Sequence, residues 1–108
     1  MAERYTRKDV DSALGRLAAA LGKPVGHYRT LAPGEESNMY PSSTYSTVPG
    51  GWALDHNPTY GGYVIHEIAD VPGETWIREP FGTERRSARE MVSVIRFALD
   101  TLAASRKV

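Results

Sequence analysis

Two histidines and two acidic residues lie close together in the stretch GGWALDHNPTYGGYVIHEI, residues 50–68. Asp55 and His56 precede a Gly-rich turn, and His66 and Glu67 follow it. Imidazole and carboxylate groups bind metal ions and transfer protons in active sites. Whether these four can act together depends on how the flanking segments pair, because successive side chains of a strand point to opposite faces of a sheet.

Two pairing registers are open for this stretch, and neither gathers both histidines and a carboxylate at one point. If His56 faces Tyr63, the two histidines lie on opposite faces of the sheet. If the pairing slips by one residue, so that Leu54 faces His66, they share a face but lie on a diagonal. A zinc site needs three or four converging ligands. We therefore expect no metal site, and we interpret His66 as a strand histidine with a hydrogen-bonding partner.

Other catalytic signatures are missing from the sequence. Ser42 and Ser43 lack the G-x-S-x-G context of a hydrolase nucleophile, and no Gly pair is followed by the G-K-[ST] of a phosphate-binding loop. The chain has no cysteine, so thiol catalysis and cysteine metal sites are excluded, and nothing marks it as secreted. We expect a non-enzymatic protein that uses no cofactor.

Two amphipathic helices frame this stretch. The first begins at the capping pair Thr6 and Asp9, has apolar residues at helical spacing, and ends at Gly22. The second begins at the capping box formed by Ser87 and Glu90, followed by a longer apolar stripe of the same spacing. Residues 104–108 are expected to fray.

The segments between the helices predict short strands. These are expected at residues 25–31, 52–56, 63–68 and 75–78, with residues 45–48 briefly extended. The order predicts an α+β fold of α-β-β-β-α type, in which both helices cover one face of a three- or four-stranded antiparallel meander.

The chain of 108 residues is expected to form a single domain. Residues 32–51, rich in Pro, Gly, Ser and Thr, are predicted to form a long flexible loop. No apolar run approaches the roughly 20 residues of a membrane span, so we expect a cytoplasmic location and no membrane partner.

The charges are unevenly distributed although the net charge is zero. Residues 30–73 contain five acidic residues and no Lys or Arg, whereas the segments before and after them are net basic. Three arginines, Arg85, Arg86 and Arg89, gather at the start of the second helix, where the helix dipole already favours an anion.

This basic run, RRSAR, and the helix order resemble the double-stranded-RNA-binding domain. That family presents a basic run at the start of its second helix after a three-stranded sheet. The resemblance implies that the three arginines grip phosphates, and we expect helpers from the first helix, namely Lys8, Arg16 and Lys23. The chain departs from the family because Glu84 and Glu90 flank the arginines. A solvated helix face with pairs such as Arg86 and Glu90 remains the alternative.

Aromatic residues are concentrated around the predicted loop and hairpin. Residues 40–63 hold five of the ten aromatic residues and no Lys or Arg, which suits protein contacts better than nucleic-acid stacking. We expect Tyr40, Tyr45 and Tyr60 to contact a protein partner, unless they only stabilise the loop.

The ordered motifs GGWALD, YGGYVIHEI and PFGTERRSAREM are similar to those of small bacteriophage proteins of unknown function, especially from phages of actinobacteria. The similarity implies a phage origin and brings no activity with it. We expect a small binding module whose partner is a host protein or a second copy of the chain, as in a homodimer. Nucleic-acid binding is the alternative.

Overall fold

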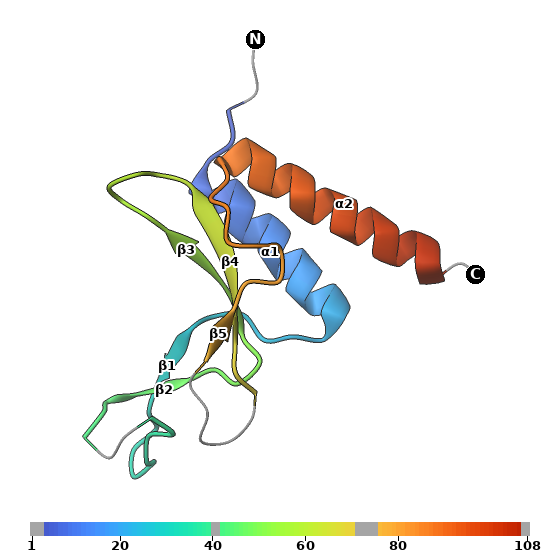
Figure 1. The fold of residues 1–108 in the computed structure, drawn as a ribbon. Helices are drawn as coiled ribbons and strands as arrows, with labels where there is room; N and C mark the ends of the chain where they lie inside the picture. The colour runs from blue at the N-terminus through green and yellow to red at the C-terminus, as the bar shows by residue number, and fades with distance from the viewer. Residues whose placement is uncertain (1–3, 40–41, 71–75, 107–108) are drawn as a thin grey trace.

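A computed structural model describes residues 4–39, 42–70 and 76–106, and it confirms the predicted α+β fold (Figure 1). Two helices frame five short strands. In chain order the elements are α1 (Arg7–Leu21), β1 (Tyr28–Thr30), β2 (Tyr45–Thr47), β3 (Trp52–His56), β4 (Tyr63–Ile68), β5 (Ile77–Arg78) and α2 (Ala88–Arg106).

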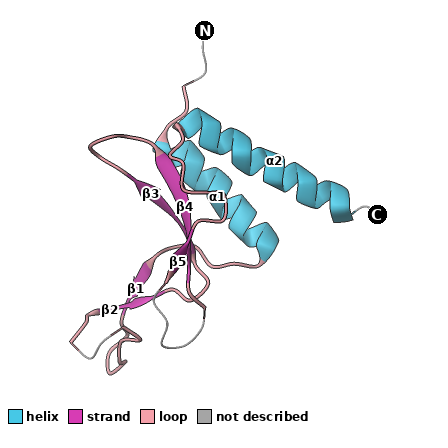
Figure 2. Ribbon diagram, in the orientation of Figure 1, coloured by secondary structure: helices cyan, strands magenta, loops and turns pink. Residues whose placement is uncertain are grey.

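The strands form two small antiparallel sheets (Figure 2). One is the expected meander, with the strand order β3-β4-β5. The other joins β1 to β2, a strand that lies within the segment predicted to be a loop. The first strand is shorter than predicted. Val25 forms an isolated parallel bridge with Trp52 of β3, and the chain then turns away at Gly26, whose φ is 119°. β1 therefore begins at Tyr28 and not at residue 25.

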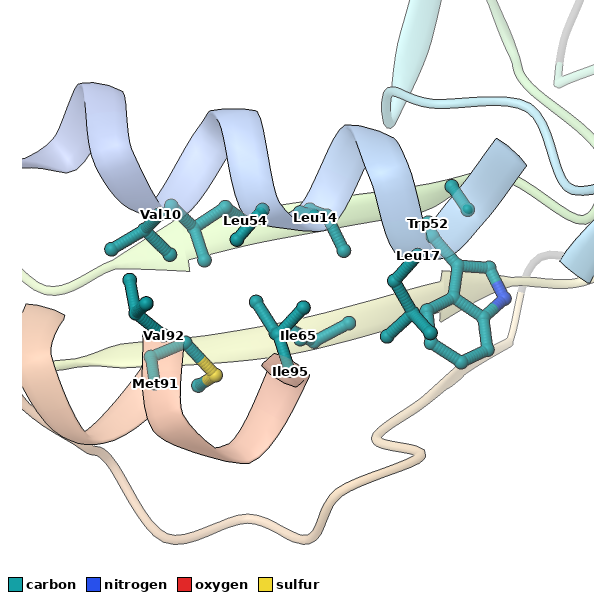
Figure 3. Packing of buried hydrophobic residues seen from close by; sticks show 11 residues of the cluster. Val10, Leu14, Leu17, Trp52, Leu54, Ile65, Met91, Val92 and Ile95 are labelled. Carbon is teal, nitrogen blue, oxygen red and sulfur yellow. The ribbon is translucent and has the colours of Figure 1, made fainter. Parts of the chain in front are cut away.

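Both helices cover the same face of the meander, and the hydrophobic core lies between them and the sheet (Figure 3). Trp52, Leu54 and Ile65 point from β3 and β4 toward the helices. Alternate residues of the same strands point to the opposite face, as strand geometry requires. The helices contribute the buried side chains of Val10, Ala13, Leu14, Leu17, Ala18, Met91, Val92 and Ile95.

The helix ends follow the capping signals. The backbone N–H of Thr6 donates to the Asp9 carboxylate at 2.7 Å, and Ser87 and Glu90 exchange reciprocal hydrogen bonds at 3.1 Å. α2 is helical through Arg106, whereas fraying was expected from residue 104. The Arg106 guanidinium donates to the Ala20 carbonyl oxygen at 2.6 Å, which places the C-terminal ends of the two helices side by side.

Side-chain hydrogen bonds connect the described part of residues 32–51 to the two-stranded sheet. The Asn38 amide accepts from the Thr47 backbone N–H at 2.9 Å, and Arg29 makes a two-pronged ion pair with Glu35. This segment therefore packs back on β1 and β2. Its flexibility stays a prediction.

Gly51 lies close to the backbone carbonyl oxygens of Gly26 and Val48. A Cβ at this position would collide with the Gly26 carbonyl oxygen and lie 2.8 Å from that of Val48. Gly15, in the middle of α1, has nothing within 4 Å of such an atom. Only the first glycine is therefore required by packing.

We expect Gly51→Ala to lower the free energy of unfolding by about 1–3 kcal/mol, because backbone must shift to admit the methyl group. The matched control, Gly15→Ala, should raise it by about 0.5–1 kcal/mol through helix propensity. Chemical denaturation followed by circular dichroism measures both. Equal effects of the two substitutions would contradict the close approach at Gly51.

Candidate functional site

The β3–β4 register separates the two histidines of the central hairpin. His56 lies opposite Tyr63, and Leu54 lies opposite Ile65. This is the first of the two registers that the sequence left open, and it puts His56 and His66 on opposite faces. The His56 ring stacks on Tyr63 with the ring centroids 4.6 Å apart. These two histidines therefore share no site.

His66 instead meets His27, a residue that the sequence did not single out. His27 Nε2 lies 3.0 Å from His66 Nδ1, and the two rings meet edge to face. The expectation that His66 has a hydrogen-bonding partner is therefore confirmed. No local pattern pointed to His27, because the contact joins residues 39 positions apart in the chain.

The His27 imidazole has a lowered pKa. Burial of the ring is the largest cause, and the charge of His66 lowers the pKa further, while that of Asp55 opposes both. Asp55 lies on the same face of the sheet as His66, since it pairs with Val64 and His66 pairs with Ala53. The charge of Asp55 therefore acts on both histidines from the face away from the helices. Within residues 4–39, 42–70 and 76–106, however, no group of three or more His, Cys, Asp or Glu side chains could hold a metal ion.

Asp55 is engaged by Arg85, the first of the three clustered arginines. The Arg85 guanidinium donates to the Asp55 carboxylate at 2.6 Å and reaches the Gly62 carbonyl oxygen at 3.4 Å. The hydrogen bond from Arg85 is the main reason that the pKa of Asp55 is lowered. Arg85 thus connects the start of α2 to the hairpin.

Arg86 is also engaged within the fold, whereas Arg89 is not. The backbone of Arg86 exchanges two hydrogen bonds with Tyr63, at 2.7 and 3.0 Å, and its guanidinium donates to the Phe81 carbonyl oxygen at 3.0 Å. Arg89 is exposed on α2. The structure therefore leaves one of the three arginines open to a ligand. The alternative pair of Arg86 with Glu90 is not among the ion pairs of the described residues.

The predicted helper residues are spread along α1 and beyond. Lys8 is exposed in the first turn, and Arg16 is exposed two turns later. Lys23 follows the end of the helix, and its Nζ lies 3.8 Å from the Glu67 carboxylate. The structure does not gather these three residues on one surface with the arginines of α2.

Glu67 is a buried carboxylate, only 5% exposed, on the helix-covered face. The Trp52 indole donates to it at 2.7 Å, and Arg78 on β5 forms an ion pair with it. Burial pushes the pKa of Glu67 upward, but these hydrogen bonds and the charges of Arg78 and Lys23 outweigh it and lower the pKa. Glu67 therefore remains ionised and connects β3, β4 and β5.

Two of the three tyrosines predicted to bind a protein, Tyr45 and Tyr60, do not share a surface. Tyr45 lies on β2 and, with Tyr28 and Met39, lines a shallow pocket of about 250 Å³. Tyr60 is 87% exposed in the turn between β3 and β4, at the opposite end of the molecule (Figure 1). Tyr40 lies outside the described residues.

The described residues also form an apolar groove that the sequence did not predict. It is a groove of about 480 Å³ between the C-terminal halves of α1 and α2 and the turn before α2. Trp52 lies in it, with Phe81 packed edge to face on the indole at 5.9 Å. The groove is lined by Leu17, Leu21, Trp52, Pro80, Phe81, Val94, Phe97, Ala98, Thr101 and Leu102.

Phe97 lies in the wall of this groove and is 75% exposed. It belongs to a second apolar stripe on α2, with Val94, Ala98 and Thr101 at spacings of three and four residues. That spacing is visible in the sequence. It did not lead to a prediction because Ala98 also fits the spacing of the stripe that faces the core.

Comparisons with known proteins add no relative to these observations. No protein-family model, curated protein or solved structure matches the chain. The phage origin and the resemblance to RNA-binding domains therefore stay predictions. None of the helices in the described part of the chain is long and apolar enough to cross a membrane.

The His27–His66 pair predicts a pH-dependent stability. Because the pKa of His27 is lowered in the folded state, the unfolded chain binds a proton there near pH 6.5 while the folded chain does not. The contribution of neutral His27 to the free energy of unfolding is therefore complete above about pH 6.5, and it is lost as the pH falls toward the pKa of His27 in the folded state. Unfolding free energies at pH 7 and pH 5.5 should show this loss.

His27→Gln should reduce the difference between the unfolding free energies at pH 7 and pH 5.5. His56→Gln, on the opposite face of the sheet, is the matched control and should leave this difference unchanged. An unchanged difference in His27→Gln would mean that the histidine pair is not its source.

Proposed function

We propose that this chain is a non-enzymatic protein-binding module whose contact surface is the groove between α1 and α2 together with Phe97. The single observation that carries the proposal is Phe97, an aromatic side chain that is 75% exposed beside an apolar concavity. Removing a Phe side chain from water contributes roughly 1.5–3 kcal/mol. Exposed apolar patches of this kind are typical of interaction sites.

The shape of the groove supports a macromolecular partner. Trp52 and Phe81 form a rigid aromatic floor, and Leu21 and Phe97 stand at its edge. Buried anchors of interfaces are most often aromatic side chains in such pockets. Small-molecule sites add several converging polar groups to orient the ligand. The polar side-chain groups of the described lining are the Thr101 hydroxyl and the Trp52 indole N–H, and both donate within the chain, to the Phe97 carbonyl oxygen and to Glu67.

The residues capable of chemistry support a non-enzymatic role because they bond to one another. Asp55 is paired with Arg85, and His27 with His66. Glu67 is surrounded by its three partners on the helix-covered face. None of these groups lines the groove. The proposed partner is a host protein or a second copy of this chain.

A photoreactive phenylalanine analogue in place of Phe97 tests this surface. We expect illumination in host lysate to give protein adducts that survive nuclease treatment. The same analogue in place of Tyr60, which is more exposed but lies in the hairpin turn, is the control and should give few adducts. Phe97 adducts no more abundant than those at Tyr60 would refute the proposed surface.

Nucleic-acid binding is the second proposal, and Arg89 is the observation that favours it. Arg89 is exposed near the N-terminal end of α2 and does not take part in the contacts that occupy Arg85 and Arg86. A helix N-terminus attracts phosphate. One open arginine supports weaker binding than the three-residue grip that the sequence predicted.

This second proposal predicts an affinity for duplex RNA that falls steeply with salt, because bound phosphates release counterions. Arg89→Ala should reduce that affinity several-fold, whereas Phe97→Ser should leave it unchanged. Fluorescence anisotropy at two salt concentrations measures both variants. Binding that depends on neither salt nor Arg89 would exclude a phosphate contact at this helix end.

A further inference from the structure

We infer that the partner seated on the groove is a second copy of this chain. The two copies are related by a two-fold axis near Ala98, so that their α2 helices cross antiparallel, the groove sides of both helices face each other, and the two Phe97 rings pack together across the axis. This inference rests on the proposed function, because it uses the same surface and names its occupant.

The first argument is that one patch carries both an exposed aromatic side chain and an apolar groove beside it. A two-fold interface brings the same patch of both subunits together, so that patch must be complementary to itself. Phe97 projects from α2, and the groove lies directly beside it, lined by Leu21, Trp52 and Phe81. Two copies therefore bury two phenylalanines and cover two grooves with one symmetric contact.

The second argument is that small side chains flank Phe97 along α2. Ser93 and Thr101 lie one turn before and one turn after it, and Ala104 lies two turns after it. Residues four and seven apart lie on the same face of a helix. All three flanking residues are exposed. A second helix can therefore approach this face closely.

The third argument is the charge pattern on the other flank of the Phe97 stripe. At 100° per residue, Val94, Ala98 and Thr101 lie on the groove side of Phe97 and Arg96 and Asp100 on the opposite side. In an antiparallel two-fold pair, equivalent flanks face each other. An axis near Ala98 therefore places Arg96 of each copy beside Asp100 of the other.

Within one copy these two charges are unused. Arg96 and Asp100 are both exposed and form no ion pair within the described residues, although they are four positions apart on one helix. The chain as a whole has a formal net charge of zero, so two copies do not repel each other at long range. The charge pattern is thus complementary to itself, as the shape is.

Sedimentation velocity of the purified chain over a range of concentrations provides the test. We expect a reversible dimer of about twice 11.9 kDa. Phe97→Ser should be monomeric at concentrations where the wild type is dimeric, and should keep its helical circular dichroism, because Phe97 lies outside the core cluster. Tyr60→Ser, which also removes an exposed aromatic ring, is the matched control and should remain dimeric.

A charge-exchange experiment makes the test specific for a second copy. Arg96→Asp brings acidic residues together across the axis, and Asp100→Arg brings basic residues together, so each variant alone should dimerise at least ten-fold more weakly. An equimolar mixture of the two restores opposite charges and should form a heterodimer. A mixture that associates no better than either variant alone would overturn the antiparallel arrangement.

Failure of this inference can be distinguished from failure of the proposed function. A wild-type monomer whose position 97 still forms adducts with another protein would refute the second copy and leave the groove as a protein-binding surface. A dimer that survives Phe97→Ser would refute the inference, because the contact would then lie elsewhere. A monomer without adducts at position 97 would refute both.

Discussion

The pairing register of β3 with β4 is the constraint on which the rest of this structure depends. Because Leu54 lies opposite Ile65, these two residues and Trp52 face the helices, and Asp55 and His66 face the other way. A slip of one residue would turn charged side chains into the core, where an unpaired charge is costly. Trp52 with Glu67 at one end of the pair and Tyr63 with Arg86 at the other support the observed register.

The charged residues of the chain serve mainly to connect its parts. Arg85 joins the start of α2 to Asp55 on β3, and Glu67 joins three strands and the end of α1. Among the described residues, no buried side-chain nitrogen or oxygen lacks a hydrogen-bond partner. A residue type that suggests catalysis in the sequence can thus be fully engaged in holding a small domain together.

α2 carries core residues on one side and residues of the proposed contact surface on another. Met91, Val92 and Ile95 pack into the core, while Val94, Phe97 and Thr101 face the groove. In a domain of this size one helix side suffices to complete the core. We propose that a partner covers the second apolar side, and the neighbouring opposite charges of Arg96 and Asp100 favour an antiparallel copy of the same helix.

Local signals in the sequence determined the helices, their caps, the α+β class and the central hairpin, since apolar spacing, capping residues and Gly-rich turns act over a few residues. They could not determine the pairing of β1 with β2, the contact of His27 with His66, or the engagement of Arg85 and Arg86. Each of these joins segments far apart in the chain, and the choice among possible partners depends on which faces the packed helices leave available. The groove beside Phe97 exists for the same reason, because its walls come from α1, α2, β3 and the turn before α2.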